Sequence, residues 1–171
     1  PASMSKFWLA VAPTKNMNRL EWVIEKAVEM GVSRITPIAC ERSERVHLKV
    51  ERLLRIAISA MKQSKGLWLP IIDELTPFKL LMESNFEAKW IAHCSVSYPR
   101  MPLVQLQEKN NQLVCIGPEG DFSQKEIELA LEKGFVGLDL GEQRLRTETA
   151  AVAVCVAGIL LNQSTTLPSA L

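Results

Sequence analysis

Two short stretches near the C-terminal end carry the residues best suited to chemistry: residues 113–123 (LVCIGPEGDFS) and residues 138–151 (LDLGEQRLRTETAA). In the first, glycines stand on both sides of a carboxylate, and glycine lets a ligand approach backbone N–H and C=O groups closely. In the second, Arg144 and Arg146 lie just ahead of a helix-start signal, and an arginine can clamp a phosphate or polarise a carbonyl oxygen. These residue types predict a ligand site lined by backbone groups and two guanidinium cations.

Both stretches have the pattern of a strand, a loop and a helix. Each begins with an apolar run that stops at a glycine-containing loop. Ser123 and Glu126 fit a capping box for the helix after the first loop. Thr147 can cap the helix after the second loop, and Glu148 suits the positive end of that helix. Because parallel sheets place ligand sites at the carboxyl ends of their strands, we expect the two loops to form one pocket.

The first loop, Gly117 to Gly120, is not a phosphate-binding P-loop, because no Gly-Lys-Ser/Thr sequence follows it. The chain also has no G-x-G-x-x-G after its first expected strand, so neither a nucleoside-triphosphate site nor a dinucleotide site is indicated. A Gly-Pro loop taken alone is more often only a turn. The specificity of the pattern therefore comes from its combination with the second loop, residues 140–147.

The elements that must position these loops alternate between strand and helix along the whole chain. This alternation predicts an α/β fold with a mostly parallel sheet and helices on both faces. The last helix is unusual because its AAVAVCVAGILL run is apolar nearly all round, so we expect the rest of the domain and a second subunit to cover it. We expect strands at 7–12, 35–40, 67–72, 89–94, 113–117 and 137–140, and helices at 20–28, 50–61, 77–82, 124–133 and 148–162, with Asn18 as the cap of the first helix.

Length and composition fit one domain, which we place at residues 7–171, after a disordered or vector-derived tail at residues 1–6. The chain has 171 residues, of which 47% are apolar, and a net charge of +1, so no global field favours nucleic acid or a membrane surface. The longest apolar run, residues 150–161, is shorter than the roughly 20 residues that a bilayer requires. We therefore expect a cytoplasmic protein with no membrane partner.

Cysteine and histidine usage gives no basis for a metal site. No C-x-x-C pair is present, the cysteines stand among apolar neighbours, and the two histidines are far apart in the sequence. This pattern is typical of buried thiols in a reducing compartment. The residues concerned are Cys40, Cys94, Cys115 and Cys155, with His47 and His93.

A locally basic stretch, residues 41–65, holds seven cations against three glutamates. Apolar residues repeat within it at helical spacing, which leaves most cations on the outer face of the expected helix. Two interpretations stay open: a solvated helix face, or a surface that binds the phosphates of RNA. The cations considered for RNA binding are Arg42, Arg45, Arg52, Arg55 and Lys65, together with Arg144 from the second loop.

Taken together, IGPEGDFS at residues 116–123, LGEQRLRTETA at residues 140–150 and Gln63-Ser64 after the basic helix resemble the RsmE family. Members of this family are SPOUT-superfamily methyltransferases of small-subunit (16S) ribosomal RNA. The resemblance covers nearly the whole chain, and its two C-terminal motifs are specific. Two features differ from the family pattern. Members carry a PUA-like RNA-binding domain before the first strand, which these 171 residues do not include, so we expect an isolated catalytic domain; and Gln63 to Gly66 reads QSKG where some members read QCGR.

The resemblance implies a C-terminal trefoil knot, a homodimer, S-adenosyl-L-methionine as cofactor, and methylation of N3 of a uridine in 16S ribosomal RNA. It also implies a proton acceptor, for which Glu119 and Glu148 are the candidates, and a role for Arg146 in stabilising charge on the uracil oxygens. The alternatives are a SPOUT enzyme with another target, such as the ribose 2′-hydroxyl of a tRNA, and a non-catalytic RNA-binding module. By position, the resemblance implies cofactor binding by His93, Cys94, Ile116, Gly117, Pro118, Gly120, Leu140, Gly141, Leu145, Arg146 and Thr147.

Overall fold

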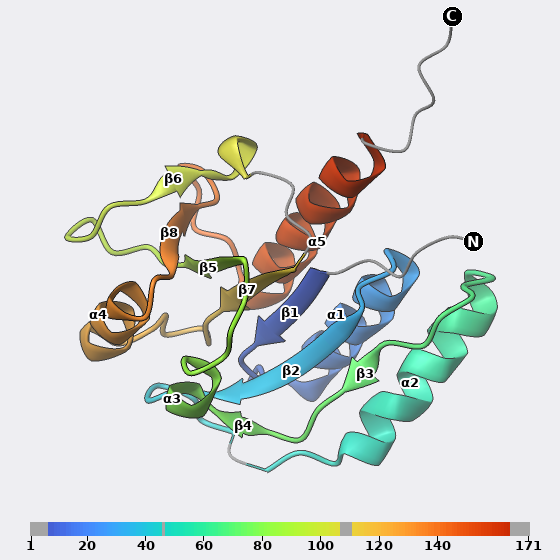
Figure 1. The fold of residues 1–171 in the computed structure, drawn as a ribbon. Helices are drawn as coiled ribbons and strands as arrows, with labels where there is room; N and C mark the ends of the chain where they lie inside the picture. Colours follow the sequence, from blue (N-terminus) through green and yellow to red (C-terminus); the bar gives the residue numbers. More distant parts are fainter. Residues whose placement is uncertain (1–6, 46, 107–110, 165–171) are drawn as a thin grey trace, which may run out of the picture.

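The computed structural model describes residues 7–45, 47–106 and 111–164 of the chain, and the expected tail at residues 1–6 lies outside this range (Figure 1). Strands and helices alternate along the described chain, as the sequence predicts. In chain order they are β1 (Phe7–Val11), α1 (Met17–Glu29), β2 (Arg34–Ala39), α2 (Val50–Gln63), β3 (Ile71–Ile72), β4 (Thr76–Pro77), α3 (Phe78–Leu81), β5 (Ala88–Ala92), β6 (Met101–Pro102), the 3-10 helix η1 (Leu103–Gln105), β7 (Gln112–Ile116), α4 (Gln124–Glu132), β8 (Val136–Asp139) and α5 (Thr147–Ser164).

The strands form one sheet whose pairings in the described chain are all parallel, in the order β3-β2-β1-β7-β5-β8-β6, with β4 also paired to β2. The middle strand of this order is β7, and its neighbour β1 is also an interior strand, which pairs with β2 on one side and with β7 on the other. Because all these strands point the same way, the segments that follow β5, β7 and β8 leave the sheet at one edge.

The sequence of β1 shows why it lies in the interior of the sheet. Leu9 and Val11 pack into the core on one face of the sheet, whereas Ala10 and Ala12 pack into the core on the other face. Alternating side chains of a strand point to opposite faces, so a strand that is apolar at every position must be covered on both. The strand expected at residues 7–12 is confirmed as β1, and both of its faces are covered.

Helices cover both faces of the sheet. The first core contains buried side chains of α1, α2 and α5, and the second contains those of α3 and α4 (Figure 1). Helix α5 contacts α1, β1 and β7, so the nearly all-apolar helix runs along the middle of the sheet. Its residue Gly158 lies against Phe7, where an added Cβ would come within 2.3 Å of the ring.

Several local predictions need correction. The N-cap of α1 is Asn16, whose side chain accepts a hydrogen bond from the backbone N–H of Asn18, so Asn18 lies inside the helix. Thr76 and Pro77 form the short strand β4 instead of a cap and first turn, and α3 begins only at Phe78. The predicted edge strand at residues 67–72 is reduced to β3, because only the residues after Pro70 pair with β2.

The expectation of buried thiols holds for Cys40, Cys115 and Cys155, whose pKa values burial raises. It is wrong for Cys94, which is exposed, because β5 ends at Ala92 and the chain leaves the sheet before Cys94. None of the helices in the described part of the chain is both long and apolar enough to cross a bilayer.

Candidate functional site

A cavity of about 230 Å³ lies at the carboxyl ends of β5, β7 and β8, and its wall is built by the segments that follow those three strands. The two loops predicted from the sequence face each other across it. Gly120 is the one residue of the predicted cofactor set that does not line the cavity. The other ten do: His93, Cys94, Ile116, Gly117, Pro118, Leu140, Gly141, Leu145, Arg146 and Thr147.

One buried hydrogen bond joins the two loops. The Thr147 hydroxyl donates to the backbone carbonyl of Gly117 at 3.0 Å. Thr147 is the first residue of α5 and not the residue before it, so the predicted N-cap role is wrong. Its side chain instead links the start of α5 to the end of β7. The first turn of α5 is held by a hydrogen bond from the backbone N–H of Ala150 to the carbonyl of Arg146.

The first loop is held in shape by Asp121, which sequence reasoning missed. This residue has a φ of +63°, in the left-handed region that asparagine and aspartate tolerate better than most residues. Its carboxylate accepts the backbone N–H of Cys94 at 2.8 Å and that of Phe122 at 2.8 Å. The bond to Cys94 ties the loop after β7 to the segment after β5. The only sequence signal for this role is an aspartate directly after the second glycine of GPEG.

Gly117 has little space for a side chain, because an added Cβ would lie 3.1 Å from two atoms of the Phe122 ring, closer than most Cβ contacts. The loop therefore folds back tightly over its own phenylalanine, which is itself buried in the second core. This close packing leaves the backbone of Gly117 and Pro118 at the cavity wall. The packing against Phe122 explains why a glycine stands at position 117.

His93 supplies a polar side chain that has no partner within the described part of the chain. The residue is 4% exposed, and neither ring nitrogen makes a hydrogen bond there. Burial lowers the pKa of His93 most strongly. The negative charge of Asp121 raises this pKa, whereas the positive charge of Arg100 lowers it further. The imidazole therefore lies at the cavity wall in its neutral form, with a nitrogen donor and a nitrogen acceptor available.

Arg100 and Asp139 brace the cavity wall next to His93, and the sequence analysis did not single them out. The Arg100 guanidinium donates to the carbonyl of His93 at 3.1 Å and lies 3.5 Å from the Asp139 carboxylate. Asp139 also accepts the backbone N–H of Gly141 at 3.1 Å. Both residues line the cavity. The ion pair joins the segment after β5 to the end of β8, so no short motif could have revealed it.

The predicted catalytic residues differ in where they lie. Arg146 is exposed and lines the cavity, with Arg144 beside it. Glu119 also lines the cavity, and its carboxylate accepts the backbone N–H of Lys15 at 2.9 Å. Glu148 is not among the lining residues and lies 3.6 Å from the guanidinium of Arg19. The structure thus brings Arg146 and Glu119 together at one cavity and leaves Glu148 behind its wall.

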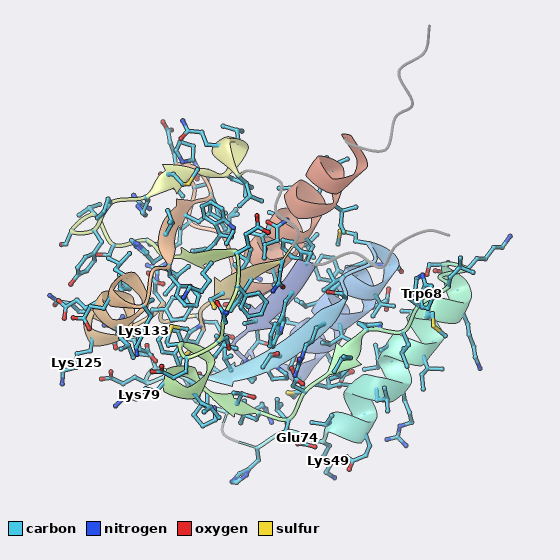
Figure 2. The ribbon with its side chains drawn as sticks, viewed as in Figure 1. Lys49, Trp68, Glu74, Lys79, Lys125 and Lys133 are labelled. Carbon is cyan, nitrogen blue, oxygen red and sulfur yellow. The ribbon has the colours of Figure 1, made fainter. Side chains whose placement is uncertain are left out.

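The basic stretch divides into two groups. Arg42 and Arg45 donate hydrogen bonds to backbone carbonyls of neighbouring loops, and Arg52 forms an ion pair with Glu21 at 2.6 Å. Arg55 and Lys65 are exposed and form no ion pair with another described residue. Neither of the two interpretations of the basic stretch is decided by these contacts, but Arg55 on α2 and Lys65 just after its end are cations whose charge no acidic residue of the described chain neutralises. Figure 2 shows Lys49 and Trp68 at opposite ends of this helix.

The described residues offer no grouping of side chains suited to a metal ion. Among them, no set of three or more histidine, cysteine, aspartate or glutamate side chains is arranged so that it could hold a metal ion.

Comparison with known proteins places this geometry in a family. A family model described as an RNA methyltransferase domain matches residues 1–158. A crystal structure described as a probable rRNA-methyltransferase from Porphyromonas gingivalis has a TM-score of 0.88 and 39% identity, over 96% of this chain and 71% of that one. The ribosomal RNA small subunit methyltransferase E from Neisseria gonorrhoeae, solved bound to S-adenosyl methionine, has a TM-score of 0.76 and 27% identity, over 89% of this chain and 64% of that one.

The similarity extends to curated sequences. The ribosomal RNA small subunit methyltransferase E of Mesomycoplasma hyopneumoniae is 34% identical over 155 residues, which make up 84% of this chain and 64% of that protein. The chain thus spans less than two thirds of the length of this curated relative. The solved structures confirm the predicted α/β architecture with a mostly parallel sheet.

Proposed function

The chain belongs to the family of RNA methyltransferase domains, and we propose that it transfers a methyl group from S-adenosylmethionine to N3 of a uridine in small-subunit (16S) ribosomal RNA. The observation that carries the proposal is the hydrogen bond from Thr147 to Gly117, which closes the two motif loops into one cavity. The RNA class comes from the names of the relatives, and the uridine N3 comes from the resemblance of the two motifs.

The residues at the cavity fit the proposed cofactor. S-adenosylmethionine is a sulfonium cation with polar amino-acid and adenosine parts. The carboxylates of Glu119, Asp121 and Asp139 at the cavity wall offer acceptors for its cationic groups, and the guanidinium groups of Arg100, Arg144 and Arg146 at the same wall offer donors for its carboxylate. The unpartnered nitrogens of buried His93 are available for a polar group of a ligand. The tight glycine loop exposes main-chain atoms at the same wall. We assign cofactor binding to the ten predicted residues that line the cavity, with Gly120 as a support for their loop.

When bound, S-adenosylmethionine supplies an electrophilic methyl group. The chain must then position the uracil and accept the proton that N3 carries at neutral pH. We propose Glu119 as the acceptor, because it lines the cavity and the Lys15 N–H orients its carboxylate. Arg146 donates to the uracil oxygens and stabilises their developing charge. Glu148 is a weaker candidate, since Arg19 and the start of α5 already account for its position.

For the RNA itself, we propose Arg144, Arg55 and Lys65 as phosphate contacts, because their charges are exposed and have no acidic partner within the described residues. The substrate is then the ribosomal RNA or the small subunit that contains it. A protein with this substrate works in the cytoplasm, where ribosomes are.

Analysis of the modified nucleoside tests the proposed reaction. Small-subunit RNA lacking the modification is incubated with the protein and S-adenosylmethionine, digested to nucleosides and analysed by mass spectrometry. We expect 3-methyluridine, and an Arg146→Ala variant should yield at least about tenfold less per unit time. A 2′-O-methyl nucleoside would replace the N3 assignment, and the absence of any methylated product would favour a non-catalytic RNA-binding module.

Cys94 offers a test that needs no RNA. It is the one exposed thiol among the described residues, and it lines the cavity. Alkylation of the native protein should modify Cys94 and spare the three buried cysteines, and S-adenosylmethionine should slow the modification. Alkylation at an unchanged rate under saturating S-adenosylmethionine would contradict the assignment of this cavity.

A further inference from the structure

We propose that Arg42 and Arg45 are positioning residues of the cofactor cavity and not contacts for RNA phosphates. The inference rests on the proposed function, because it assigns these arginines to the shaping of the methyl-donor site. Both lie in residues 41–45, the segment that follows β2, and neither lines the cavity itself. They act through the backbone of the loops that do.

Arg42 holds the loop after β7 from outside. Its guanidinium donates to the carbonyl of Gly120 at 2.8 Å and to that of Phe122 at 3.4 Å. These two carbonyls flank Asp121, whose φ of +63° is a conformation that costs free energy for any residue except glycine. A charged donor that binds both neighbouring carbonyls stabilises this conformation.

The effect of Arg42 reaches the cavity through Asp121. In its left-handed conformation, Asp121 accepts the backbone N–H of Cys94 and joins the end of β5 to the glycine loop. Asp121 and Cys94 both line the cavity. Loss of the Arg42 contacts should therefore loosen a wall of the site that Arg42 does not touch.

Arg45 positions Glu119, the proposed proton acceptor, through the backbone of Lys15. Its guanidinium donates to the carbonyl of Lys15 at 2.8 Å, and the N–H of the same residue donates to Glu119 at 2.9 Å. The ammonium of Lys15 also pairs with Glu44 at 2.7 Å, which raises the pKa of Lys15. Residues 41–45 thus fix both sides of Lys15, and Lys15 orients Glu119.

A third contact anchors the segment to α4. The backbone N–H of Glu41 donates to Glu126 at 2.8 Å. Glu126 is the buried member of the capping box with Ser123, so its carboxylate is already fixed by the start of α4. The segment therefore contacts the loop after β7 at its middle and at its end, which is what a support for that loop requires.

The experiment separates cofactor binding from RNA binding. Affinity for S-adenosylmethionine is measured by calorimetry without RNA, and affinity for a small-subunit RNA fragment is measured without cofactor at several salt concentrations. The variants are Arg42→Ala, Arg42→Lys and Arg45→Ala, with Arg55→Ala on α2 as the matched control. Thermal unfolding checks that each variant is folded.

We expect Arg42→Ala to weaken cofactor binding by about tenfold or more, the equivalent of one charge-assisted hydrogen bond. Arg42→Lys should recover little, because an ammonium keeps the charge but not the planar geometry of a guanidinium. Neither variant should change the salt dependence of RNA binding. Arg45→Ala should lower the methylation rate more than the cofactor affinity, since it acts on Glu119. Arg55→Ala should show the opposite pattern, with a shallower salt slope and unchanged cofactor affinity.

The proposal would be overturned if Arg42→Ala bound the cofactor with unchanged affinity. It would also be overturned if Arg42→Lys fully restored cofactor affinity and Arg42→Ala showed a shallower salt dependence of RNA binding. If the wild-type protein binds no S-adenosylmethionine, the proposed function fails. Amide hydrogen exchange of the protein without ligand then still tests whether Arg42 positions the loop. Arg42→Ala should accelerate exchange at the amides of Cys94 and Phe122, and exchange at the wild-type rate would overturn it.

Discussion

At the scale of single residues, the site depends on side chains that bind backbone groups of distant segments. Thr147 donates to Gly117, Asp121 accepts from Cys94, and Arg42 donates to Gly120. Such contacts fix loops that have no regular structure of their own. A cavity built in this way should be sensitive to the loss of a single hydroxyl.

Thr147→Val tests the bond between the two loops. The variant keeps the shape of the side chain but leaves the Gly117 carbonyl without its donor, so the free energy of unfolding should fall by about 1–3 kcal/mol. Affinity for S-adenosylmethionine should fall with it, because both loops line the cavity. Thr147→Ser keeps the hydroxyl and should bind like the wild type. Equal affinities of the valine and serine variants would show that the bond has no role in binding.

His93 should contribute to the dependence of stability on pH. Its pKa in the folded protein lies below the ordinary value of 6.5, mainly because burial disfavours the charged ring. As the pH falls, the unfolded chain takes up this proton first, so the folded state loses stability. We expect the free energy of unfolding from urea titrations to decrease between about pH 7 and pH 5.5. In His93→Asn the decrease should be smaller, and an identical slope in both proteins would contradict this reading.

The sequence predicted those parts of the site that depend on a local pattern and missed those that depend on contacts between distant segments. The two motif loops could be found because glycines and arginines close to a helix start form a local pattern. Asp121 could not be found, because it binds a backbone N–H that only the folded sheet brings near, and the pairing of Arg100 with Asp139 could not be found for the same reason. For Arg42, charge pattern suggested RNA, whereas the folded chain places a carbonyl 78 positions away within its reach.

At the scale of elements, hydrophobic periodicity predicted the long helices and the central strands. It did not predict β4 and β6, since a two-residue strand is defined by its neighbour and not by its own sequence. The order of the strands was also beyond periodicity, because it depends on how the connections cross the sheet. The capping box of α4 was predicted correctly, because Ser123 and Glu126 form it within one turn.

The end of α2 offers an element-scale test. Ser64 is the C-cap, and the next residue, Lys65, has a φ of +56°, a position where helices usually place glycine. The glycine of this chain comes one position later, at Gly66. Lys65→Gly should therefore raise the free energy of unfolding by about 1 kcal/mol, as measured by chemical denaturation. A decrease would show that the lysine side chain makes a contact that outweighs its backbone strain.

At the scale of the whole molecule, the trefoil knot and the homodimer implied by the family resemblance stay predictions. Helix α5 gives a reason to expect the dimer, because its apolar residues Val156 and Leu160 are 42% and 59% exposed in the single chain. An apolar helix face that remains exposed favours association with a second copy.

Substitution of this face tests the dimer. The wild-type chain should sediment as a dimer, and Val156→Asp with Leu160→Asp should sediment as a monomer, because a buried charge would be left unpaired. Leu80→Asp is the matched control: Leu80 is 64% exposed but lies on α3, on the opposite face of the sheet. A monomeric wild type, or a control that also dissociates, would count against an interface at α5.

The central claim is that the loops after β7 and β8, together with the end of β5, bind a methyl donor as one pocket. A titration of isotope-labelled protein with S-adenosylmethionine, followed by backbone amide chemical shifts, tests it most directly. The account predicts saturable shifts at residues 93–94, 116–121 and 138–147, with little change along α2 and β3. Shifts confined to another surface, or none at all at saturating cofactor, would contradict it.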